Sequence, residues 1–131
     1  MSHITSMIET HPNTTSDLDV AKLGDCIAAC FECAQTCTAC ADACLGEEMV
    51  TELRNCIRLN LDCADICTAT GHILSRRTGS NLATVKAVLE ACRIACAECA
   101  AECEKHADMH DHCRICAEAC RRCEEIGRAH V

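Results

Sequence analysis

The stretch CIAACFECAQTCTACADAC, residues 26–44, places a cysteine at alternating intervals of four and three residues. This alternation is the a and d spacing of a helix that turns one side toward a bundle interior. We therefore expect a helix from about residue 17 to residue 45, with a stripe of thiols along its buried seam. The stripe consists of Cys26, Cys30, Cys33, Cys37, Cys40 and Cys44.

The same spacing recurs in three later segments. Each predicts another helix, over about residues 47–77, 81–106 and 109–128. The second helix carries Cys56, Cys63 and Cys67, the third Cys92, Cys96, Cys99 and Cys103, and the fourth Cys113, Cys116, Cys120 and Cys123. All seventeen cysteines of the chain therefore lie at seam positions, and Asn60 is the residue that interrupts the series.

The segments between the cysteine stripes suggest where the helices begin and end. Ser16 with Asp19 resembles a capping box for the first helix, Gly46 suits the C′ position that ends it, and Ser80 suits the cap of the third. Glu47 and Glu48 suit the first turn of the second helix, near its positive dipole end. Connections of a few residues predict antiparallel neighbours. The fold class is all-α, an up-down-up-down four-helix bundle over residues 17–131, preceded by a polar tail or short helical arm at residues 1–16.

Composition excludes several classes of protein. No stretch approaches the roughly 20 apolar residues of a membrane span. The net charge of −8 and the single aromatic residue, Phe31, argue against a nucleic-acid partner. The first residues show no apolar leader, and the odd number of cysteines argues against a disulfide scaffold. We expect a cytoplasmic protein with reduced thiols.

A buried stripe of thiols indicates soft-metal binding. Cysteines alone would make a poor apolar core, and disulfides within a helix would be strained. Zinc and iron–sulfur sites favour ligands from loops, whereas Cu(I) accepts two or three sulfurs that bridge adjacent ions. The cysteine pattern therefore favours the binding of many Cu(I) ions, and zinc stays an alternative.

The repeated C-x-x-x-C pairs on four helices resemble the bacterial copper storage proteins, and the absence of a leader resembles their cytosolic branch. Examples are Cys26/Cys30, Cys92/Cys96 and Cys116/Cys120. The resemblance implies a bundle filled with Cu(I)-thiolates, usually a homotetramer, that stores copper without catalysis. Asn60 departs from the cysteine pattern, so its role as a ligand stays open.

The two ends of the predicted bundle differ in chemistry. One end collects sulfur and imidazole donors, namely His106, His110, Met49 and Met109 beside the last cysteines. The other end collects Leu23, Leu74, Val85 and Leu89. We expect Cu(I) to enter and leave by the histidine and methionine end. His106 and His110 continue the seam of the third helix, whereas His112 is out of register and is expected in solvent.

Three alternative functions follow from other readings of the thiols. The first is a buffer for zinc or other heavy metals. The second is a thiol redox protein, for which Cys113 near a helix N-terminus is the candidate low-pKa thiol. The third is a copper chaperone, which needs one exposed site rather than seventeen buried thiols.

Overall fold

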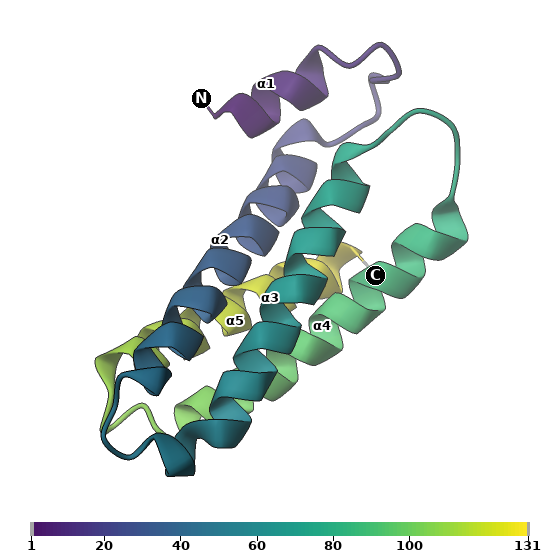
Figure 1. The fold of residues 1–131 in the computed structure, drawn as a ribbon. Helices are drawn as coiled ribbons and strands as arrows, with labels where there is room; N and C mark the ends of the chain where they lie inside the picture. The colour runs from purple at the N-terminus through teal and green to yellow at the C-terminus, as the bar shows by residue number, and fades with distance from the viewer. Residues whose placement is uncertain (1, 131) are drawn as a thin grey trace.

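The computed structural model describes residues 2–130, and the regular secondary structure in that range is entirely helical. A short helix, α1 (His3–Glu9), precedes the four long helices α2 (Val20–Leu45), α3 (Arg54–Ser75), α4 (Leu82–Glu104) and α5 (Asp111–His130). A turn of 3-10 helix, η1 (Val50–Leu53), leads into α3. Each long helix packs on the next, and α5 closes the ring against α2 (Figure 1). The predicted four-helix bundle is confirmed.

Contacts between thiols show that α3 and α4 run in opposite directions. On α3 and α4, the Sγ atoms of Cys56 and Cys103 lie 3.7 Å apart, while those of Cys67 and Cys92 lie 3.8 Å apart. From one contact to the next, the residue number therefore increases along α3 and decreases along α4, which matches the directions of these helices in Figure 1.

Several predicted helix ends were wrong. The first long helix is capped by Asp19, whose side chain accepts a hydrogen bond from the Lys22 backbone N–H at 2.9 Å, and not by Ser16. Gly46 ends it with φ of −84°, so no left-handed residue is needed there. Asn81 rather than Ser80 caps α4, and its side chain makes no capping hydrogen bond. These ends depend on backbone directions that polar residues alone do not determine.

The start of α3 and the end of α4 also differ from the prediction. Glu47 and Glu48 lie in a turn before η1, not in the first turn of a helix. The third long helix stops at Glu104, so His106 lies in the connecting turn and His110 directly precedes α5. The two histidines therefore do not continue the helical ladder beyond Cys103, because the chain leaves the helix before it reaches them.

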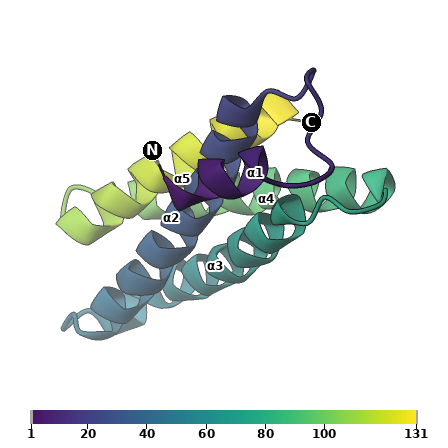
Figure 2. The ribbon, with the colours of Figure 1, turned by 90° about the horizontal axis from the view of Figure 1, so that it is seen from above.

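Two apolar clusters fill the molecule. The larger contains most of the cysteines together with small residues such as Ala34, Ala64 and Ala100. The smaller closes one end of the bundle with Ile8, Ile27, Leu74 and Leu89. Ile8 belongs to α1, which lies across the beginning of α2 (Figures 1 and 2). The N-terminal arm thus extends the hydrocarbon cluster at this end of the bundle. Within the described residues, no helix is long and apolar enough to span a membrane.

Candidate metal centre

The cysteines form one buried column along the axis of the bundle. Each of the seventeen is at most 2% exposed, and all are free thiols. Neighbouring Sγ atoms across helices lie at hydrogen-bonding distances, for example 3.5 Å between Cys37 and Cys120 and 3.9 Å between Cys33 and Cys63. Such separations are far longer than the roughly 2 Å of a disulfide bond. They leave room for metal ions between sulfurs.

The column consists of overlapping groups of four donor atoms within 4.8 Å of one another. Cys37 and Cys120 belong to two such groups, one completed by Cys33 and Cys63 and the other by Cys99 and Cys116. A thiol shared between groups can bridge two ions. Cu(I) accepts two or three soft sulfur ligands, so a shared column suits a chain of adjacent Cu(I) ions better than separate closed sites.

Asn60 lies inside this column and is fully buried. Its Oδ1 accepts hydrogen bonds from the thiols of Cys99 at 2.9 Å, Cys116 at 3.1 Å and Cys103 at 3.5 Å, and its Nδ2 donates to Cys56 at 3.7 Å. The side chain therefore replaces one sulfur with an amide oxygen among four thiols. A metal that reaches this level of the column meets an oxygen donor as well as sulfur.

His112 turns inward, and the expectation that it lies in solvent was wrong. Its Nδ1 lies 3.4 Å from Cys40 Sγ and 3.6 Å from Cys113 Sγ, and these residues form a four-donor group with Cys44. Because His112 lies in the first turn of α5, its seam register gives no hint of this direction. The only signal in the sequence was its position beside Cys113.

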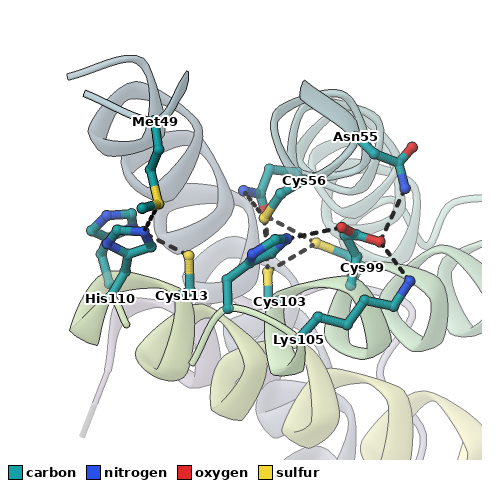
Figure 3. Close-up of polar contacts among 12 residues, drawn as sticks. Met49, Asn55, Cys56, Cys99, Cys103, Lys105, His110 and Cys113 are labelled. Atoms are coloured by element: carbon teal, nitrogen blue, oxygen red, sulfur yellow. Dashed lines mark hydrogen bonds and ion pairs between the residues drawn. The ribbon is translucent and has the colours of Figure 1, made fainter. Parts of the chain in front are cut away.

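We call the end of the bundle that contains Met49, His110 and His112 the mouth, and its other residues lie near this group. His110 Nε2 lies 3.4 Å from Met49 Sδ, and Figure 3 shows the Met49 sulfur pointing toward His110, with Cys113 nearby. The structure thus brings together Met49 and His110 as the sequence suggested. It does not do so for Met109, whose side chain is 62% exposed.

His106 is held by a buried carboxylate rather than by a thiol. Glu102 Oε2 accepts from His106 Nε2 at 3.0 Å, and Oε1 accepts from Asn55 and Lys105 at 3.0 and 3.1 Å (Figure 3). Burial acts to raise the pKa of Glu102, but these three hydrogen bonds outweigh it and leave the pKa below its usual value. Glu102 was not among the predicted site residues, because its partners come from α3 and from the turn after α4.

The mouth thiols differ in acidity. Hydrogen bonds from Cys103 and Cys56 lower the pKa of the Cys40 thiol to about 6, and His112 acts in the same direction. Burial raises the pKa of Cys44 and of Cys113, and the nearby Cys40 adds to the rise. Cys113 is therefore not the low-pKa thiol expected for the redox alternative. The most acidic mouth thiol is Cys40, which is buried beside an imidazole.

His112 and Glu47 are joined by a hydrogen bond at the same end, with 2.8 Å between His112 Nε2 and Glu47 Oε2. Burial acts to lower the pKa of His112, but contacts with Cys40 and Glu47 prevail and raise it. The hydrogen bond from His112 in turn lowers the pKa of Glu47. The end with the histidines is therefore polar, whereas Leu74 and Leu89 close the opposite end.

A helical bundle with a buried, shared column of reduced thiols and one polar end defines a class of protein that holds many soft metal ions. The chain belongs to the copper storage protein family, whose family model matches residues 19–131. No curated protein matches the chain significantly.

Solved structures of copper storage proteins are closely similar to this one. The protein Ccsp from Streptomyces lividans, loaded with 10 copper equivalents, is 49% identical over 96% of each chain, with a TM-score of 0.93. A cytosolic copper storage protein from Streptomyces lividans with five coppers is 54% identical over 83% of this chain and 91% of its own, with a TM-score of 0.82. The Cu(I)-bound copper storage protein BsCsp3 is 39% identical over 79% and 92%, with a TM-score of 0.71.

Proposed function

We propose that this chain stores and sequesters many Cu(I) ions in the cytosol, without catalysis, on the thiolates of its core. The observation that carries the proposal is the sharing of thiols such as Cys37 and Cys120 between adjacent four-donor groups. The relatives that were solved with five coppers, with 10 copper equivalents and with Cu(I) bound support the choice of metal.

Parallel titrations with Cu(I) and Zn(II) test this function. Seventeen thiolates that each bridge at most two ions offer about 34 sulfur bonds, which hold about 11 to 17 Cu(I) at three or two bonds each. Zinc needs four donors per closed site, so the same thiols hold about four Zn(II). Reduced protein is titrated anaerobically in competition with chelators. Saturation at one or two Cu(I) would instead indicate a chaperone, and stronger retention of zinc would indicate a zinc buffer.

We also propose that copper enters and leaves at the end that contains His106 and His110. Imidazole and thioether donors lie there, whereas Leu23 and Leu74 belong to the hydrocarbon cluster at the other end. Imidazole binds Cu(I) less strongly than thiolate, so ions should pass inward from the histidines to the cysteines.

Transfer rates distinguish the two ends. Replacing both His106 and His110 with Phe should slow loading from a Cu(I) chelate and removal by a strong chelator, while saturation falls by about one or two ions. The matched control replaces Leu23 and Leu74 with Ala, which widens the opposite end. If rates respond to the control and ignore the histidine pair, copper enters at the hydrocarbon end.

The oligomeric state is a further part of the proposal, namely a homotetramer. The exposed apolar residues Ile94 and Ile115, 44% and 49% exposed, offer surface that a second chain would bury, and Leu61 adds to it. Light scattering coupled to chromatography should give four times the chain mass of 14.1 kDa. A monomer at micromolar concentration would contradict the tetramer.

A further inference from the structure

Glu47 connects His110 and His112 at the mouth through a single oxygen atom. Its Oε2 lies 3.0 Å from His110 Nδ1 and 2.8 Å from His112 Nε2. The two imidazole rings stack, with centroids 5.4 Å apart and planes at 18°. Glu47 lies in the turn after α2, whereas His110 directly precedes α5 and His112 lies in its first turn, so one carboxylate joins two ends of the chain's connections that are far apart in sequence.

The chemistry of the carboxylate assigns the hydrogens on both rings. An ionised carboxylate oxygen only accepts hydrogen bonds, so each ring nitrogen that faces it carries a hydrogen. A neutral imidazole has one N–H, and its second nitrogen keeps a lone pair. The lone pair is therefore on Nε2 of His110 and on Nδ1 of His112. The two histidines have opposite tautomers.

The lone pairs face two different sets of sulfur atoms. His110 Nε2 lies 3.4 Å from Met49 Sδ, next to a hollow lined by Met49, Glu47 and His110. His112 Nδ1 lies 3.4 Å from Cys40 Sγ and 3.6 Å from Cys113 Sγ, inside the thiol column. Each imidazole thus offers its lone pair beside a sulfur, one at the surface and one in the core.

We propose that Glu47 is the positioning residue of copper uptake. It holds His110 and His112 in opposite tautomers, so that a Cu(I) ion passes from an outer Met49 and His110 pair to an inner group of His112, Cys40 and Cys113. The inference rests on the proposed storage function. Carboxylates commonly orient metal-binding histidines in this way, and their removal weakens binding by about 10- to 100-fold.

The tautomers are tested first in the reduced, metal-free protein. Nitrogen-15 NMR of the imidazoles distinguishes a hydrogen on Nδ1 from one on Nε2. We expect His110 with Nδ1–H and His112 with Nε2–H. In Glu47→Ala, His110 should change toward the Nε2–H form, while Glu48→Ala, which removes an exposed neighbouring charge, should leave both rings unchanged. Unchanged tautomers in Glu47→Ala would overturn the proposal.

Loading kinetics then test whether this positioning matters for uptake. Glu47→Ala should slow loading from a Cu(I) chelate about tenfold without lowering the saturation stoichiometry. Glu47→Gln should restore most of the rate, because an amide oxygen still accepts two hydrogen bonds. Equal slowing by Glu48→Ala or by Glu47→Gln would assign the effect to charge and overturn positioning. Failure of storage itself would be seen separately, as a wild-type protein that binds few Cu(I) ions.

Discussion

Removing two shared thiols should lower the copper capacity by a small and calculable amount. The double substitution of Cys37 and Cys120 by Ala deletes two sulfurs that lie 3.5 Å apart and belong to two four-donor groups. If every thiolate bridges two ions, about 34 sulfur bonds become about 30. At two bonds per ion the capacity falls from about 17 to about 15 Cu(I), and at three from about 11 to about 10.

The double variant should still fold. Each deleted sulfur is a buried group of roughly methylene size or larger, so the pair should cost about 2–4 kcal/mol including the cavities left behind. This is less than the unfolding free energy of a typical domain, about 5–15 kcal/mol. Far-UV circular dichroism of the reduced, metal-free protein should therefore remain strongly helical.

The measurement is an anaerobic Cu(I) titration to saturation, with Leu89→Ala as the control. Leu89 is buried in the hydrocarbon cluster, 3% exposed, so its truncation destabilises the bundle by about 2–5 kcal/mol without removing a thiol. The control should keep the full capacity. An unchanged capacity in the double cysteine variant would show that these thiols do not bind copper. The two groups together contain six thiols, which offer about 12 sulfur bonds, so a loss of about four to six ions would show that each group binds or fails as a unit, which contradicts bridging between groups.

Two further outcomes follow from packing and charge. A Cβ atom on Gly71 would lie 2.7 Å from Cζ of Phe31, so Gly71→Ala should destabilise the metal-free protein by about 1–3 kcal/mol in thermal unfolding. The control is Gly127→Ala, whose added Cβ meets open space and should stabilise the helix by up to about 1 kcal/mol. The pKa of Glu102 is lowered in the folded protein, so its contribution is present above the usual pKa of 4.5 and is lost as pH falls below that value. Glu102→Gln should therefore be less stable by about 1 kcal/mol at pH 7 and close to the wild type near pH 3 in denaturant titrations; a constant difference at both pH values would contradict the carboxylate's role.

The periodicity of the cysteines was sufficient to predict the core. Intervals of three and four residues place side chains on one face of a helix whatever the neighbours are, and all seventeen thiols are buried as that rule requires. The hydrocarbon end followed in the same way, because Leu74 and Leu89 continue the seams of their helices. Soft sulfur in such a column also restricts the chemistry to thiophilic metals.

The arrangement of the mouth could not be predicted in this way. His106 and His110 lie outside the helices, so helical spacing says nothing about where their rings point. The register of His112 predicted a solvent-facing side chain, yet His112 contacts Cys40 from another helix, because the turn before α5 brings the beginning of that helix against the end of α2. The lowered pKa of the Cys40 thiol likewise depends on other helices, because it comes first from hydrogen bonds with Cys103 on α4 and Cys56 on α3.

The sequence by itself therefore determined which residues face the axis, how many thiols the column holds and which end is closed by hydrocarbon. These properties depend on helical period and residue type, which are local. Only the tertiary structure decided which thiols share neighbours and that Asn60 accepts hydrogen bonds from three of them. It also decided that Glu47 faces both His110 and His112. Those contacts join segments far apart in the chain, and their distances depend on how the helices pack and where the turns between them lead.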